Sequence, residues 1–149
     1  MQTDPPIGLP DRSGLLAGLE ELIAADASPV VFAISVDGFA EMLDGDGDPV
    51  DGLELELGAR LSRLVRSNDV LASLGPGLFA LGGGGIEEVD AAQLLDRVRG
   101  VFAVPIEVDG DFVSLPVTVG VAHFAPKMTG RALLEAAESD LAAKQRHRG

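Results

Sequence analysis

The sequence predicts an α+β fold, in which helices flank a central, mostly antiparallel β-sheet. Apolar residues recur at helical spacing in several separate stretches, and short runs rich in β-branched residues lie between them. Two of these runs are separated only by Gly75-Pro76-Gly77, which is typical of a hairpin. Helices combined with hairpin-connected strands are characteristic of the α+β class.

Each predicted element has its own signal in the sequence. The first helix follows the cap candidates Asp11 and Ser13, carries leucines at helical spacing, and ends before Pro29. A second amphipathic helix is marked by leucines from Leu53 to Leu64. The remaining predictions are strands at 30–36, 70–74, 78–81, 104–108 and 112–121, helices at 90–102 and around 133–141, and a flexible turn at 82–85.

Composition predicts a single domain that covers residues 1–149. Hydrophobic residues make up 46% of the chain, enough for a substantial core, and the absence of cysteine excludes disulfides and thiolate metal sites. The longest apolar run, Val30 to Ile34, is far shorter than the roughly 18 residues that a membrane-spanning helix needs. We therefore expect a soluble, cytoplasmic protein or an excised domain.

The distribution of charge predicts where an anion could bind. The formal net charge of −13 disfavours nucleic acid and anionic membranes as partners, because neutralising phosphates requires clustered basic residues. Between Ser13 and Ala59 there are eleven acidic residues and neither Lys nor Arg. Any anionic ligand is therefore expected in the second half of the chain.

Short fragments along almost the whole chain match, in order, the motifs of one known family. They are an opening signature at Asp4, Gly8, Leu9, Pro10 and Arg12, the segments 34–39, 74–79 and 116–122, and a closing motif at Ala143, Lys144 and Arg148. This ordered set resembles the GGDEF family of bacterial diguanylate cyclases. The resemblance implies the palm fold of nucleotide cyclases.

The resemblance also implies an expectation about catalysis. Enzymes of this family condense two GTP molecules into cyclic di-GMP with the help of divalent metals. The family's metal ligands fall on Ser35 and Gly77, which offer a neutral hydroxyl and no side chain. Further signature positions carry Ala40, Leu43, Gly52, Pro76 and Leu78 in place of the family's residues. From these replacements we expect a catalytically inactive member that is not an enzyme, with no metal and no cofactor.

One family feature is kept. Arg66-Ser67-Asn68-Asp69 resembles the Arg-x-x-Asp inhibitory site, and Arg97 matches an arginine that supplies a second contact in that family. Arginine can make paired contacts to guanine or phosphate, and aspartate can accept from guanine N1 and N2. Cyclic di-GMP binding by Arg66, Asp69 and Arg97 is therefore expected, and Arg60 and Arg63 extend the patch if the helix continues that far. The alternative is a helix-end arginine and a turn-forming aspartate.

Two other groups of residues have two interpretations each, and the two histidines predict no site. Lys144 and Arg148 match phosphate-contacting residues of the family, or they are basic residues favoured by a helix C-terminus. Asp44-Gly45-Asp46-Gly47-Asp48 begins like a calcium loop, but Pro49 and Leu55 break the pattern, which favours a solvated acidic connection. His123 and His147 are too dispersed to predict a metal site.

Two functional hypotheses follow from these observations. In the first, the domain is a cyclic di-GMP receptor that conveys the ligand's presence to a protein partner or to a second copy. In the second, it binds no nucleotide and is an interaction or dimerisation module, with Leu43, Pro76 and Leu78 as an apolar contact. Residual GTP binding through Lys144 and Arg148 is a third, weaker alternative.

Overall fold

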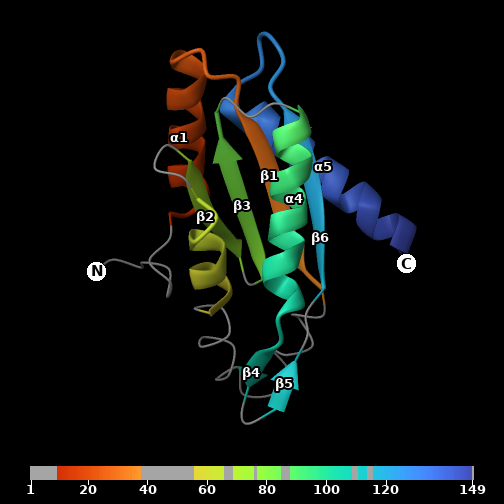
Figure 1. Cartoon of the computed structure of the whole chain (residues 1–149). Coiled ribbons are helices and arrows are strands. Elements are labelled where there is room, and N and C mark those ends of the chain that lie inside the picture. The colour runs from red at the N-terminus through yellow and green to blue at the C-terminus, as the bar shows by residue number, and fades with distance from the viewer. Residues whose placement is uncertain are drawn as a thin grey trace.

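The computed structural model describes residues 10–37, 56–65, 69–75, 77–84, 88–108, 111–113 and 116–148. In that part of the chain, a four-stranded sheet is covered by helices on both faces (Figure 1). The elements are α1 (Arg12–Ala24), β1 (Val30–Val36), β2 (Val70–Gly75), β3 (Leu78–Gly83), α4 (Glu88–Ala103), β4 (Ile106–Val108), β5 (Asp111–Val113), β6 (Val117–His123) and α5 (Gly130–Arg148). A further helical segment occupies residues 56–62.

The main sheet has the strand order β2-β3-β1-β6, and every neighbouring pair is antiparallel. The central strand β1 is apolar at all positions but one, as expected for a strand buried on both faces. Ser35 of β1 lies opposite Leu78 of β3 on one side and Thr118 of β6 on the other. This arrangement confirms the predicted α+β class and the mostly antiparallel sheet.

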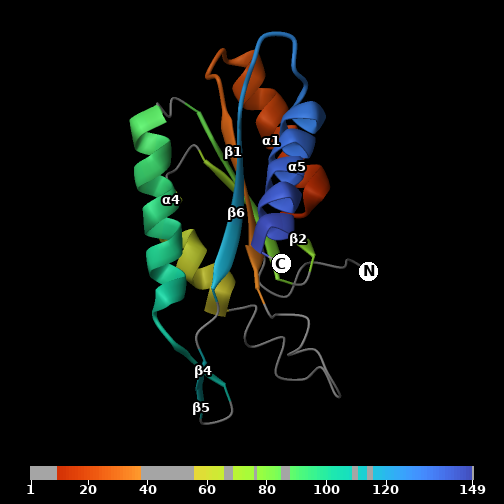
Figure 2. The ribbon, with the colours of Figure 1, turned by 90° about the vertical axis from the view of Figure 1, so that its right-hand side faces the viewer.

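The sheet separates two hydrophobic cores, because successive side chains of a strand point to opposite faces. Phe32 and Ile34 of β1 pack in one core with apolar residues of α4 and of the 56–62 segment. Val31 and Ala33 pack in the other core with residues of α1 and α5. Figure 2 shows α1 and α5 on one face of the sheet and α4 on the other.

Side-chain oxygens accept hydrogen bonds from backbone N–H groups at the N-termini of α1 and α5, the two helices on the same face of the sheet. Asp11 caps α1 as predicted, since its Oδ1 accepts a hydrogen bond of 3.0 Å from the Gly14 N–H. At the start of α5, the Gly130 N–H donates to Glu20 Oε2 at 2.7 Å, and the Ala132 N–H donates to Thr129 Oγ1 at 3.1 Å. Glu20 therefore ties α1 to the N-terminus of α5.

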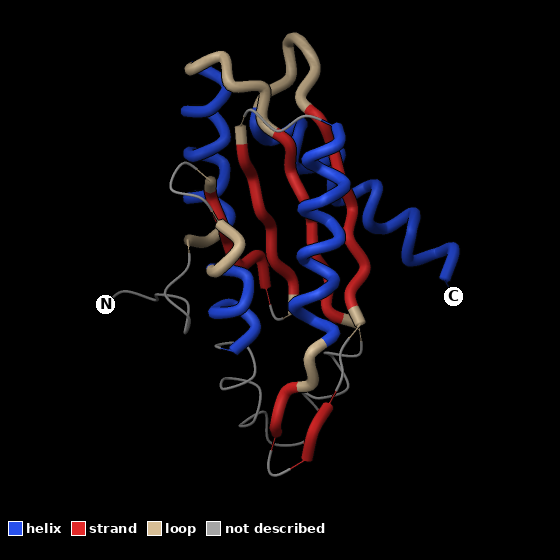
Figure 3. The backbone as a smooth tube through the Cα atoms, viewed as in Figure 1, coloured by secondary structure: helices blue, strands red, loops and turns tan. Residues whose placement is uncertain are grey.

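Several of the predicted boundaries are wrong. The strand predicted at 104–108 begins at Ile106, and the helix predicted to reach Leu64 ends at residue 62. Gly82 and Gly83 were expected in a flexible turn, but they belong to β3, where a Cβ added at Gly82 would lie 2.8 Å from Leu19 Cδ2. The predicted strand 112–121 is divided between β5 and β6, and β6 begins directly after Pro116, which has no N–H for a ladder. Figure 3 shows β4 and β5 as a separate two-stranded ribbon below the main sheet.

None of the helices in the described ranges is both long enough and apolar enough to cross a membrane. Within the same ranges, no three His, Asp or Glu side chains are grouped closely enough to hold a metal ion.

Candidate functional site

Two of the positions that correspond to the family's metal ligands lie next to each other at one end of the sheet. The Val36 N–H donates a hydrogen bond of 2.8 Å to the Gly77 carbonyl oxygen, and Ser35 lies opposite Leu78 in the β1–β3 ladder. Gly77 has a φ of 70°, in the left-handed region that favours glycine. Leu78 is half-buried and packs against the core formed with α1 and α5. Part of the apolar surface suggested for a protein contact is thus already used inside the domain.

The polar side chains at this end of the sheet bond to other side chains of the chain. Ser35 Oγ accepts a hydrogen bond of 3.1 Å from Gln145 Nε2 of α5. Thr118 Oγ1 donates to the Asp37 carboxylate, with distances of 3.1 Å to Oδ1 and 3.0 Å to Oδ2. Gln145 had no signal in the sequence beyond its place beside Lys144, because its partner lies 110 residues away.

Lys144 lies against the outer strand of the sheet. Its Nζ donates to the Val119 carbonyl oxygen at 3.0 Å and pairs with Asp140 Oδ2 at 3.1 Å. The same carboxylate oxygen accepts the Val121 N–H at 2.8 Å. Lys144 and Asp140 therefore bond backbone groups on the outer edge of β6. Arg148 lies in the last turn of α5, and its side chain is outside the described part.

The pKa of Asp140 predicts an acid-sensitive contribution to stability. Burial raises this pKa, but the hydrogen bond from Val121 and the nearby Lys144 outweigh that effect, so the pKa is lower than usual. A lowered folded-state pKa stabilises the fold above the unfolded pKa of about 4, and the contribution is lost as the pH falls through the folded pKa. Asp140→Asn should therefore reduce the loss of unfolding free energy between pH 6 and pH 3, measured by urea denaturation. Equal acid sensitivity in parent and variant would contradict this assignment.

Several predicted positions lie outside the described residues. These positions are Asp4, Gly8, Leu9, Ala40, Leu43, Gly52, Arg66 and Pro76, together with the acidic segment Asp44–Asp48.

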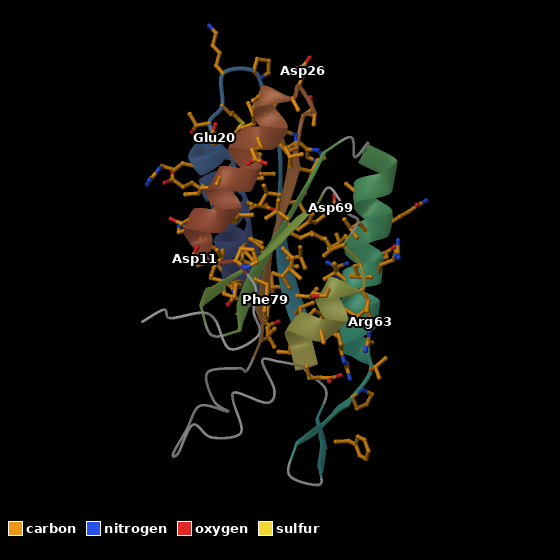
Figure 4. All side chains as sticks on the ribbon, turned by 90° about the vertical axis from the view of Figure 1, so that its left-hand side faces the viewer. Asp11, Glu20, Asp26, Arg63, Asp69 and Phe79 are labelled. Atoms are coloured by element: carbon orange, nitrogen blue, oxygen red, sulfur yellow. The ribbon has the colours of Figure 1, made fainter. Side chains whose placement is uncertain are left out.

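Asp69, the last residue of the Arg-x-x-Asp motif, immediately precedes the outer strand β2. Figure 4 looks onto this edge of the sheet and shows Asp69 between α1 and α4. Asp69 lines a groove with a volume of about 530 Å³, within the usual range for ligand pockets. The other lining residues are Gly18, Glu21, Leu22, Ala25, Ala27, Val70 and Gly84.

Arg97 and Arg63 are exposed on the α4 side of the sheet. Arg97 lies in α4, and Arg63 follows the 56–62 segment, where Figure 4 shows it beside α4. Neither side chain makes a hydrogen bond or ion pair with another residue in the described part of the chain. Arg97 is not among the residues that line the groove at Asp69.

Arg60 does not extend an exposed positive patch, because the residue is only 8% exposed. The helical segment ends at residue 62, and residues 63–64 form a turn, so the helix does not continue to Arg66. The guanidinium of Arg60 instead donates to three backbone carbonyls at the end of α4, and its Nε also pairs with Glu56 Oε2 at 3.1 Å. The carbonyl contacts are Nη1 to Val101 O at 2.8 Å, Nη1 to Val104 O at 2.5 Å and Nη2 to Pro105 O at 3.1 Å.

The chain has relatives of known name, although no family model matches it. It is 28% identical over 124 residues to the oxygen sensor protein DosP of Escherichia coli K12, an alignment that covers 83% of this chain and 16% of DosP. It is 28% identical over 145 residues to diguanylate cyclase DgcP of Pseudomonas aeruginosa, an alignment that covers 93% of this chain and 22% of DgcP. The chain thus spans about a fifth of the length of these curated relatives.

Several solved structures of GGDEF proteins have a fold similar to that of this chain. A sensory box/GGDEF family protein from Caulobacter crescentus matches with a TM-score of 0.86 and 27% identity, over 99% of both chains. Diguanylate cyclase SiaD of Pseudomonas aeruginosa, solved with its activator SiaC, matches with a TM-score of 0.86 and 26% identity over 97% of this chain and 58% of SiaD. The GGDEF domain of DgcB from Caulobacter crescentus, solved with cyclic di-GMP, matches with a TM-score of 0.85 and 19% identity. The match covers 97% of this chain and 90% of the DgcB chain.

The four-stranded antiparallel sheet with its flanking helices is the palm fold of GGDEF cyclase domains. The chain is therefore similar in sequence to diguanylate cyclase DgcP, and similar in both sequence and fold to solved GGDEF proteins.

The expectation that the chain is not an enzyme is wrong. The relative DgcP is named as a diguanylate cyclase and the solved neighbours as GGDEF proteins, and nothing observed in this chain demonstrates a loss of activity. Ser35 and Gly77 show only that two positions lack a carboxylate side chain.

Proposed function

We propose that this GGDEF domain binds cyclic di-GMP at an inhibitory-type site formed by Arg66, Asp69 and Arg97. The observation that carries the proposal is the position of Asp69, which lines a groove of ligand size and comes directly after the Arg-x-x part of the motif. The exposed guanidinium of Arg97 on α4 supplies a second cationic group. The complex of the DgcB GGDEF domain with cyclic di-GMP supports the choice of ligand.

The chemistry of these side chains suits a cyclic guanine dinucleotide. Its two phosphates are anionic, and guanidinium groups bind phosphates through paired, charge-assisted hydrogen bonds. Its guanine bases present N1 and N2 donors, which the Asp69 carboxylate can accept. In a chain with a net charge of −13, an exposed arginine without an internal partner in the described residues is well suited to an anionic ligand.

Arg97→Ala is expected to weaken cyclic di-GMP binding by tenfold or more, since one lost charge-assisted contact costs about 1.5–3 kcal/mol. The measurement is calorimetric titration of the folded variants. Arg131→Ala is the matched control, because Arg131 is also exposed but lies on α5, across the sheet from α4. Equal affinities for the two variants would exclude Arg97 from the site.

Asp69→Ala is expected to reduce the preference for cyclic di-GMP over cyclic di-AMP, because adenine lacks the N1–H and the N2 amino group that a carboxylate reads. The measurement is the ratio of the two affinities in parent and variant. Glu21→Ala removes the other carboxylate that lines the groove and should leave that ratio unchanged. An unchanged ratio in Asp69→Ala would show that Asp69 does not read guanine.

A further inference from the structure

We infer that Arg60 is a positioning residue for the proposed cyclic di-GMP site, and this inference rests on the proposed function. Arg60 is buried where the 56–62 segment meets the end of α4. The 56–62 segment leads into the Arg-x-x-Asp motif, and α4 carries Arg97. Arg60 joins these two elements through a single side chain.

The contacts of Arg60 fix the end of α4 in both distance and orientation. The planar guanidinium donates to carbonyls of Val101, Val104 and Pro105, which lie 41, 44 and 45 residues further along the chain. The bond from Nε to Glu56 Oε2 orients the guanidinium from its own helix. A rigid fork with several donors constrains its acceptors more tightly than a single ammonium does.

Arg97 lies one helical turn before Val101, the first of these acceptors. A shift of the end of α4 would therefore move Arg97 relative to Asp69. Since a ligand that bridges two elements binds most tightly when they are already correctly spaced, loosening this tie should weaken binding. Arg60 would act on the ligand through Arg97 and would not contact the ligand itself.

The ordinary role of such an arginine is to satisfy carbonyls at a helix C-terminus. That role predicts a loss of stability and no specific effect on ligand affinity. The positioning role makes an additional prediction, because the effect on affinity must depend on the presence of Arg97.

The test is a double-mutant cycle on cyclic di-GMP affinity, measured by calorimetry at a temperature where every variant is folded. Arg60→Lys keeps the charge but removes the fork, and it is expected to weaken binding about fivefold in the parent. In an Arg97→Ala background, the same substitution should change the affinity less than twofold. Gly120→Ala destabilises the contact of β6 with α5 instead, and this control should leave the affinity unchanged.

The outcomes separate this inference from the function on which it rests. If the parent does not bind cyclic di-GMP, the proposed function itself fails. If the parent binds and Arg97→Ala weakens binding, but Arg60→Lys has no effect or the same effect in both backgrounds, only the positioning role is excluded. If Arg60→Lys does not fold, Glu56→Gln weakens the same tie from an exposed position, and its effect should also disappear in the Arg97→Ala background.

Discussion

Arg60→Ala is expected to lower the free energy of unfolding by about 3 kcal/mol, as measured by urea denaturation. The substitution removes three hydrogen bonds from a charged group to carbonyls at the end of α4, and it leaves a space among buried side chains. For a domain of this length, the loss corresponds to a decrease in Tm of roughly 10 °C.

Arg63→Ala is the control for Arg60→Ala. Arg63 carries the same side chain three residues later, but this side chain is exposed and makes no hydrogen bond or ion pair in the ranges that the structure describes. Its removal should change the unfolding free energy by less than about 0.5 kcal/mol. Similar effects of the two substitutions would mean that the Arg60 contacts do not hold α4.

Gly120→Ala is expected to cost about 3 kcal/mol of unfolding free energy, because α5 packs its backbone directly on β6 at this residue. A Cβ added at Gly120 would lie 2.7 Å from Leu141 Cα and closer still to the Ala137 carbonyl oxygen and the Leu141 nitrogen. These neighbours are backbone atoms, which cannot turn away as a side chain does. The helix would have to move away from the strand.

Gly100→Ala provides the matched control for Gly120→Ala. A Cβ added at Gly100 meets no atom within 4 Å, and the residue lies inside α4, where Ala is the better helix former. This substitution should therefore increase stability by up to about 1 kcal/mol. The packing explanation would be wrong if both glycine substitutions changed the unfolding free energy in the same direction.

The fold could be predicted from the sequence because its main signals are local. The apolar run of β1, the leucine spacing of α1 and the Asp11 cap depend on neighbours in the chain, and the structure confirms all three. Gly82 was assigned to a turn because its sequence neighbours are glycines. In β3 it lies close to the Leu19 side chain of α1, and no local pattern in the sequence records that contact.

The residues of the candidate site were harder to predict from the sequence, because their contacts are not local. Arg60 and Gln145 make their contacts with residues 41–45 and 110 positions away, so their spacing gives no signal. The resemblance to GGDEF proteins identified the positions of Ser35 and Gly77, and the structure brings them together. Their identity alone did not determine whether the chain is an enzyme.

The central claim is that cyclic di-GMP binds through the Arg-x-x-Asp motif, and a calorimetric titration of the intact chain with this ligand tests it most directly. The parent is expected to bind with a Kd in the micromolar range or tighter, and an excess of GTP should not displace the ligand. Arg66→Ala should remove this binding in a variant that still folds. No binding by the parent, or equal binding by Arg66→Ala, would contradict the account.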